Sequence, residues 1–175
     1  VERLPANPLL RSAQAQLSEM RRYWDSARSY QMERGLPSWG EFPADLIAWE
    51  ISQELHFTAY DYDSECIGYF SLATSDPEIW GEHEKGDAIY IHRMCVNPAK
   101  RGKSFTAHVL SWARGYGIAS HRKFVRMDTW AANEPLVEYY KSCGFKHVRD
   151  KQLGSMPKLL GHYDNIVLAL FQNEL

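Results

Sequence analysis

The sequence predicts an α/β (α+β) fold in which a mixed central sheet of about six to seven strands is flanked by helices on both faces. Three observations lead to this prediction. Amphipathic helical patterns occupy the front of the chain, and two β-prone runs joined by a polar turn follow them. The second half then alternates strand, helix, strand and helix before a closing pair of strands. A length of 175 residues suits one domain, so we expect residues 1–175 to form a single unit.

Two helices are predicted in the front of the chain. The first carries one apolar stripe and ends at Gly35-Leu36-Pro37. A second helix begins near Pro43, because proline is tolerated in a first helical turn. Both apolar faces predict core packing. The stripe of the first helix consists of Leu10, Ala13, Leu17, Met20, Trp24 and Ala27.

Three strands are predicted next. HFTAYDY and ECIGYFSLA are β-prone runs separated by Asp63-Ser64, which is typical of an antiparallel hairpin. SDPEIWGEHEKGD then reads as a polar loop containing proline and glycine. The third run, AIYIHRMCV, is stopped by Asn97-Pro98.

The second half predicts two helices between strands. The first helix is closed by Gly115 and Gly117, and FVRMDTW follows as a strand. A short helix over 135–143 lies between Pro135 and a capping Gly144. FKHVRD and YDNIVLALFQ are the last two strands. One face of the first helix consists of Phe105, Val109, Trp112 and Tyr116.

The charge balance excludes several classes of partner. Twenty basic and 22 acidic residues leave a net charge of −2, so no electrostatic footprint for nucleic acid or an anionic membrane surface is present. No apolar run is long enough to span a membrane, and the first residues lack the pattern of a signal peptide. We therefore expect a cytoplasmic protein without nucleic-acid or membrane partners.

The cysteines and histidines do not indicate metal or disulfide chemistry. Cys66, Cys95 and Cys143 are odd in number and widely spaced, as expected of free thiols in a reducing compartment. The seven histidines form no HExxH motif, and no CxxC pair occurs. We expect no metal.

The segment 97–106 allows two interpretations. Gly102-Lys103-Ser104 resembles the end of a nucleotide-binding P-loop, with Asn97 in place of its first glycine. Fewer than eighty residues remain after Ser104, too few for the doubly wound sheet and magnesium-binding aspartate of such an NTPase. Alternatively, a tight loop leading into a helix binds a coenzyme pyrophosphate with its unpaired backbone N–H groups. Arg101 and Lys103 would add positive charge to such a loop, and Ser104 and Thr106 hydroxyl donors.

A downstream segment favours the coenzyme. NEPLVEYYKSCGF, from Asn133 to Phe145, together with Arg101-Gly102-Lys103-Ser104-Phe105-Thr106, resembles the GCN5-related N-acetyltransferases (GNAT). This family transfers acetyl groups from acetyl-CoA to amines, and its pyrophosphate loop has the pattern Q/R-x-x-G-x-G/A. The resemblance covers roughly residues 55 to 175, and it departs from the pattern at Ser104 and Thr106, which replace both later glycines.

The resemblance implies a division of the chain and a set of roles. Residues 88–145 would form the acetyl-CoA-binding core, and the front helices, 8–54, the acceptor side. The backbone of Met94, Cys95 and Val96 would hold the pantetheine arm, with an N–H group stabilising the oxyanion. Asn133 would bind the pantetheine amide, unless it is only a helix cap. Tyr140 would bind the coenzyme and protonate its departing thiolate, whereas Tyr139 is expected to pack. The implied loop residues are Arg101, Gly102, Lys103, Ser104, Phe105 and Thr106.

The base, the acceptor and the assembly stay open at this point. Glu50, Glu54, His92 and Asp128 are all candidates for the general base, and a water chain to a distant carboxylate is an equal alternative. The acceptor is expected to be a small amine or an amino acid derivative, and a homodimer is possible. The alternative function is a non-catalytic acyl-CoA-binding module on the same fold. The aromatic residues that could line an acceptor pocket are Trp24, Tyr30, Trp39, Trp49 and Trp80.

Overall fold

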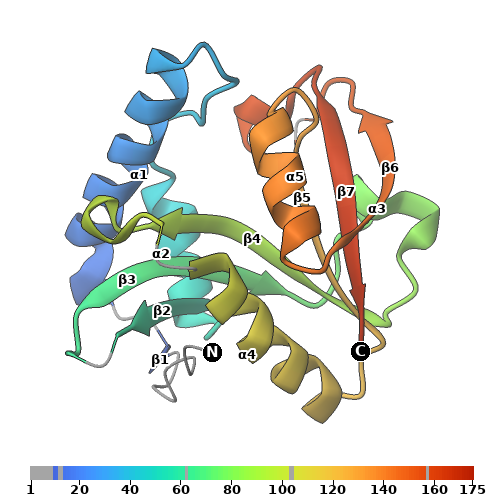
Figure 1. Ribbon diagram of the computed structural model, residues 1–175, viewed down its shortest axis with the longest axis horizontal. Coiled ribbons are helices and arrows are strands. Elements are labelled where there is room, and N and C mark those ends of the chain that lie inside the picture. The colour runs from blue at the N-terminus through green and yellow to red at the C-terminus, as the bar shows by residue number, and fades with distance from the viewer. Residues whose placement is uncertain (1–9, 12–13, 62, 103–104, 157) are drawn as a thin grey trace.

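The computed structural model describes residues 10–11, 14–61, 63–102, 105–156 and 158–175 (Figure 1). Seven strands form one sheet in the order β1-β2-β3-β4-β5-β7-β6, in which β4 and β5 are parallel and all other neighbours antiparallel. The strands are β1 (Leu10–Arg11), β2 (His56–Tyr60), β3 (Cys66–Ala73), β4 (Ala88–Val96), β5 (Phe124–Trp130), β6 (Lys146–Gln152) and β7 (Val167–Glu174).

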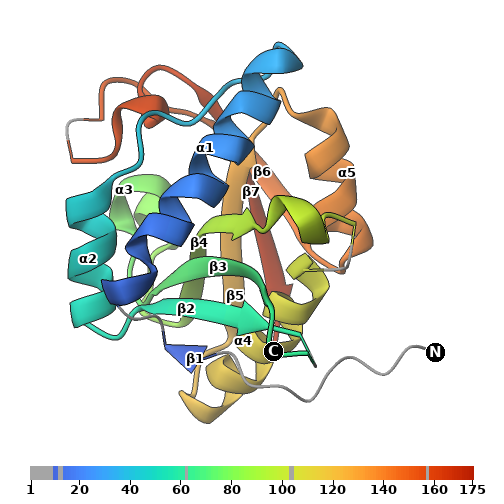
Figure 2. The ribbon, with the colours of Figure 1, turned by 90° about the vertical axis from the view of Figure 1, so that its left-hand side faces the viewer.

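Helices cover both faces of this sheet, as the sequence predicts. Figure 2 shows α2 and α3 on one side of the sheet and α4 and α5 on the other. Short 3-10 turns occur at 14–16, 81–83, 98–100 and 161–163. The helices are α1 (Leu17–Glu33), α2 (Ala44–Ser52), α3 (Pro77–Trp80), α4 (Phe105–Ala119) and α5 (Glu134–Ser142).

The core follows the alternation of side chains along the strands. Ile89 and Ile91 of β4 face α4 and α5 in the largest apolar cluster, which also contains Val109 of α4. Tyr90 of β4 faces the opposite side and packs with Trp80 of α3. A third cluster joins α1 and α2 to the sheet through Met20, Trp24, Phe42, Ile47, Tyr69 and Cys95.

Three expectations about local structure are corrected. The first helix begins at Leu17, because Leu10 lies in β1 and pairs with Thr58 at the edge of the sheet; Ala13 lies outside the described residues. Helix α4 continues through Gly115 and Gly117 to Ala119. The segment 75–87 contains α3, which Asp76 caps by accepting a hydrogen bond from the Ile79 amide.

The last two strands lie in the sheet in the reverse of their order along the chain. β7 lies between β5 and β6, so the last strand of the chain is internal and β6 forms the edge. No helix among the described residues has the length and apolar character to cross a bilayer.

Candidate active site

A β-bulge in β4 is the local feature on which the site is built. Tyr69 of β3 pairs with Cys95 and Ser71 with His92, so two residues of β4, Arg93 and Met94, lie opposite one residue of β3. Arg93 adopts a left-handed backbone conformation with φ of 51°. The bulge interrupts the alternation of side chains, so that consecutive residues His92 and Arg93 both contact polar groups on the α2 and α3 side of the sheet.

The hydrogen-bonded pairing of β4 with β5 ends at Tyr90, just before the bulge, and the two strands separate from there. Within the part of the chain that the structure describes, these parallel strands pair at three positions only, from Ala88 with Phe124 to Tyr90 with Arg126. The remainder of both strands borders a cleft of about 780 Å³. The carboxyl ends of two parallel strands thus open into one cavity, a common location for binding sites in α/β proteins.

One part of the cleft brings together the residues that the resemblance assigned to the coenzyme. Lys103 and Ser104 lie outside the described residues, and all the other assigned positions line this one cavity. Their roles remain predictions, but residues separated by more than 40 positions in the sequence share one surface. These residues are Met94, Cys95, Val96, Arg101, Gly102, Phe105, Thr106, Asn133 and Tyr140.

The loop before α4 has the features of an anion site. Gly102 has a φ of +79°, a left-handed conformation that suits glycine, and α4 begins at Phe105. Amide groups at a helix start are unpaired, and the helix dipole is positive there. Arg101 adds a guanidinium that donates to Ser26 Oγ at 3.2 Å and lies 4.8 Å from the centre of the Tyr30 ring. This positive end of the cleft can therefore accept a phosphate.

Gly68 of β3 allows α4 to approach the cleft. A Cβ atom at this position would lie 2.6 Å from the carbonyl oxygen of Cys95 and 2.8 Å from the ring of Phe105. Because both neighbours line the cleft, this glycine determines how closely helix and strand meet at the site.

Helix α5 supplies three polar groups to the cavity. Asn133 caps the helix by accepting from the Leu136 amide, and it also lines the cleft, so the capping interpretation holds without excluding a binding role. Tyr140 is buried against Phe145 and Phe171, and burial raises the pKa of its phenol. Tyr139 is 39% exposed and lines the same cavity, so the expectation that it only packs is incomplete.

The cysteine at the site is a thiol rather than a nucleophilic thiolate. Burial raises the pKa of Cys95 to about 12 and that of Cys66 to about 11. Cys66, Cys95 and Cys143 are free cysteines in the described structure, as the sequence predicts.

A buried ion pair lies beside the bulge on the α2 side. Arg93 pairs with Glu50 of α2 and donates through Nε to Ser71 Oγ at 3.2 Å, while Ser71 donates to Glu50 Oε2 at 2.6 Å. Glu50 is thereby occupied and does not line the cleft. Glu54 is not among the residues that line it either.

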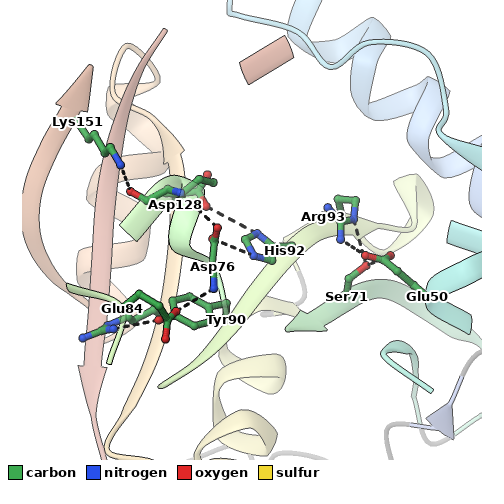
Figure 3. Close-up of polar contacts among 11 residues, drawn as sticks. Glu50, Ser71, Asp76, Glu84, Tyr90, His92, Arg93, Asp128 and Lys151 are labelled. Atoms are coloured by element: carbon green, nitrogen blue, oxygen red, sulfur yellow. Dashed lines mark hydrogen bonds and ion pairs between the residues drawn. The ribbon is translucent and has the colours of Figure 1, made fainter. Parts of the chain in front are cut away.

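A second polar cluster lies on the other side of the bulge (Figure 3). Nε2 of His92 is 3.2 Å from Asp76 Oδ2, and Nδ1 is 3.8 Å from Asp128 Oδ1. The pKa of Asp128 is raised to about 6, chiefly by burial; His92 and Arg93 oppose this change and the neighbouring Asp76 adds to it. The candidate atoms of the three side chains lie within 4.8 Å of one another, a spacing also compatible with a bound cation.

Aromatic side chains line several parts of the cleft. Of the aromatic residues expected there, Tyr30 and Trp39 line the cavity, whereas Trp24 is buried behind Trp39, Trp80 belongs to the core and Trp49 is 54% exposed. Trp130, His162 and Tyr163 complete the wall.

Sequence reasoning missed Asp76, Trp130, His162 and Tyr163. The Asp76-Pro77 pair is a recognisable helix start, but this signal gives only the cap. His162 and Tyr163 lie in the loop before β7, and the ring of His162 is 5.9 Å from that of Trp130, a contact with no local sequence signal. Burial lowers the pKa of His162 to about 4, so this imidazole is neutral.

The sheet with separated central strands is that of the GNAT fold class, and comparison with known proteins agrees. A model of the acetyltransferase (GNAT) family matches residues 20–145. The chain therefore belongs to the GNAT family, as the resemblance indicates.

Individual relatives support the same fold. The chain is 28% identical over 95 residues to the uncharacterized N-acetyltransferase YesJ of Bacillus subtilis (strain 168). The aligned region covers 52% of this chain and 53% of that protein, so the chain spans about half of its length. An acetyltransferase of the GNAT family from Listeria monocytogenes 4b F2365 superposes with a TM-score of 0.72 at 20% identity, over 96% of this chain and 94% of the other. Naa20 of Chaetomium thermophilum, solved with a bisubstrate analogue, gives a TM-score of 0.69 at 15% identity, over 97% and 87%.

Proposed function

We propose that the protein transfers an acetyl group from acetyl-CoA to a primary amine of a small molecule or amino acid derivative, by direct attack in a ternary complex. The observation behind this proposal is the cleft between β4 and β5. Its coenzyme residues and its aromatic and acidic residues lie along one continuous cavity, so a thioester and an amine can meet beside β4. Bringing two reactants together in this way accounts for much of the rate of such reactions.

The coenzyme would lie along β4 and end at the start of α4. Beyond Tyr90, β4 does not pair with β5, so its backbone edge faces the cleft at Met94, Cys95 and Val96. A pantetheine arm contains amide groups that can hydrogen-bond such an edge as an extra strand would. The pyrophosphate would contact the amides around Gly102 and the guanidinium of Arg101.

The chemistry requires no covalent enzyme intermediate. The amine nitrogen attacks the thioester carbon, a backbone N–H group of β4 stabilises the oxyanion, and the carbon–sulfur bond then breaks. Tyr140 would give its proton to the departing sulfur. The phenol is protonated at neutral pH, so it has a proton to donate as the sulfur becomes basic.

A small acceptor suits the cavity better than a strongly basic protein segment. The near-neutral net charge of −2 gives no indication of a strongly basic partner. The aromatic rings of Trp130 in β5 and Tyr163 in the 161–163 turn line the cleft. Apolar walls with a few polar groups are typical of sites for small molecules.

Calorimetric titration with acetyl-CoA, with ATP-Mg as the parallel ligand, tests the coenzyme. We expect micromolar binding of acetyl-CoA and none of ATP. A panel of benzylamine, 2-phenylethylamine, spermidine and phenylalanine amide, with detection of released thiol, then tests transfer. Binding of acetyl-CoA without transfer to any amine would instead support the non-catalytic acyl-CoA-binding module.

Tyr140→Phe tests the acid within the same assay. We expect turnover to fall about 100-fold or more while acetyl-CoA affinity stays nearly unchanged. Tyr116→Phe is the matched control, because Tyr116 stacks on Trp112 in α4 and does not line the cleft. Turnover of Tyr140→Phe equal to that of the control would show that another group protonates the thiolate.

A further inference from the structure

We propose that His92 is the base that accepts the proton of the attacking amine, that Asp76 is a positioning residue for His92, and that the acceptor binds as an ammonium ion held by Asp128. This inference rests on the proposed acetyl transfer and names the charge state of its acceptor. It also selects among the base candidates that the sequence leaves open.

The position of the three side chains relative to the cleft gives them different tasks. His92 of β4 and Asp128 of β5 line the cavity at the point where the two strands separate, whereas Asp76 does not line it. The Nδ1 atom of His92 is 3.8 Å from Oδ1 of Asp128, which lines the cavity, and Nε2 is 3.2 Å from Oδ2 of Asp76, which does not (Figure 3). A ligand in the cleft therefore meets Nδ1 and the Asp128 carboxylate together.

Asp76 is held in place by groups other than His92. Its Oδ1 accepts from the Ile79 amide at 3.4 Å, and its own amide donates to Glu84 Oε2 at 2.8 Å. Its Oδ2 lies 3.2 Å from Nε2 of His92, without a well-aligned hydrogen bond to His92 or to any other described residue. This distance is shorter than the 3.8 Å from Nδ1 to Asp128, so the charge of Asp76 favours the tautomer with the proton on Nε2. The lone pair of Nδ1 can then accept a proton from the amine, as a base requires.

The charges around the cluster leave a place for a cation. The side chains of Asp76 and Asp128 are 8% and 5% exposed, and Asp128 Oδ1 has no hydrogen-bond partner among the described residues. Nearby cations are already engaged, since Arg93 pairs with Glu50 and Lys151 donates to two backbone carbonyls of α3. A buried carboxylate without a partner is costly, and a cation beside it removes that cost.

The remaining neighbours of His92 carry no charge that would replace such a cation. Tyr90 stacks on the imidazole from the same strand, and Ser71 lies opposite on β3. Tyr163 borders the cluster from the 161–163 turn, and burial raises the pKa of its phenol, so it stays neutral. The gap of 3.8 Å between His92 Nδ1 and Asp128 Oδ1 is too long for a direct hydrogen bond. An ammonium group beside this gap can donate to both atoms.

The proton balance of the reaction follows from this arrangement. The ammonium ion gives one proton to Nδ1 of His92, and the neutral amine attacks the thioester carbon. The imidazolium that forms lies between two carboxylates, which stabilise it. A second proton leaves nitrogen as the intermediate collapses and replaces the one that Tyr140 donates to sulfur. The amide product is neutral, so Asp128 no longer holds it, and His92 releases its proton to solvent.

The test compares acceptors that differ in charge. The best alkylamine of the panel is an ammonium ion at neutral pH, whereas O-benzylhydroxylamine is mostly neutral there. His92→Gln should lower turnover of the alkylamine about 100-fold or more, with a much smaller effect on O-benzylhydroxylamine and unchanged acetyl-CoA affinity. His108→Gln is the matched control, because His108 is also a buried histidine but does not line the cleft.

The two aspartates have distinct signatures. Asp76→Asn keeps a side chain that caps α3 but removes the negative charge beside the imidazolium that forms during the reaction. The kcat for the alkylamine should then fall about 10-fold or more with KM for the amine unchanged, while kcat for O-benzylhydroxylamine should change much less. Asp128→Asn should instead raise KM for the alkylamine while leaving KM for O-benzylhydroxylamine nearly unchanged.

Several outcomes would overturn the proposal. If His92→Gln slows both acceptors equally, or if its profile matches that of His108→Gln, His92 is not the base. Loss of activity with a chelator and recovery with Zn²⁺ would assign the cluster to a metal ion. If the wild-type protein acetylates amines but these variants behave like the control, only this inference fails. If the wild-type protein acetylates no amine, the proposed function fails together with it.

Discussion

Replacing Gly68 by alanine would test how closely α4 approaches the sheet at the cleft. The added Cβ would lie 2.6 Å from the Cys95 carbonyl oxygen and 2.8 and 2.9 Å from two atoms of the Phe105 ring. The carbonyl belongs to the backbone of β4, and the ring is buried in the largest apolar cluster, so neither can move without shifting its neighbours. Overpacking of this kind costs about 1–3 kcal/mol.

Calorimetric melting measures this cost directly. For a chain of this size, 1 kcal/mol corresponds to about 2–4 °C in Tm, so Gly68→Ala should melt about 2–12 °C below the wild-type protein. Because Cys95 and Phe105 both line the cleft, affinity for acetyl-CoA should fall as well.

Gly40→Ala is the control, since no atom lies within 4 Å of a Cβ built at Gly40. Its free energy of unfolding should stay within about 0.5 kcal/mol of the wild-type value, so its Tm should change little. If Gly68→Ala melts together with Gly40→Ala and binds acetyl-CoA normally, the close approach of α4 to β4 is not a constraint on the site.

Three further changes have expected outcomes. Glu50→Gln leaves Arg93 buried without its partner and should lower the free energy of unfolding, measured in urea, by about 3–5 kcal/mol. Glu138→Gln, at an exposed pair with Lys141, should change this free energy by under about 1 kcal/mol. Equal effects of the two changes would refute the importance of burial. Because burial raises the pKa of Asp128 from 3.8 to about 6, the folded state binds this proton more tightly, so the carboxyl lowers stability as pH rises from about 4 to about 6. Asp128→Asn should flatten that part of the pH–stability curve, and an unchanged slope would contradict the burial argument. Gly115→Ala, in open space within α4, should stabilise the protein by about 0.5–1 kcal/mol in thermal melts, and a lower Tm would show an unrecognised contact.

Local sequence patterns predicted most of the strands and helices. The run FVRMDTW coincides with β5 and AIYIHRMCV with β4, because side chains that alternate between two buried faces leave a local signal. The predicted end of α4 was wrong at Gly117 for a tertiary reason. A Cβ there would overlap with Cδ1 of Leu175, so this glycine leaves room for the last side chain of the chain within a continuing helix.

The candidate site was predictable only in its coenzyme half. The positions around Arg101 and Tyr140 follow from two sequence segments, each compact enough to recognise as a pattern. Asp76, by contrast, presents only a helix-start signal, although its second carboxylate oxygen faces His92. The bulge at Arg93 has no residue signature of its own, since arginine is an unusual choice for a positive φ.

The sequence by itself determined the type and order of most of the elements, though not of β1 and α3, together with the family and the segments from which a coenzyme loop is made. Periodicity, turn residues and short motifs are properties of neighbouring residues, so they can be read from one chain. Tertiary structure alone decided that β4 and β5 separate after three pairs, and that His92 lies between carboxylates from two other segments. These features arise because backbone pairing and packing act between residues far apart in sequence, where no local pattern records which groups will meet.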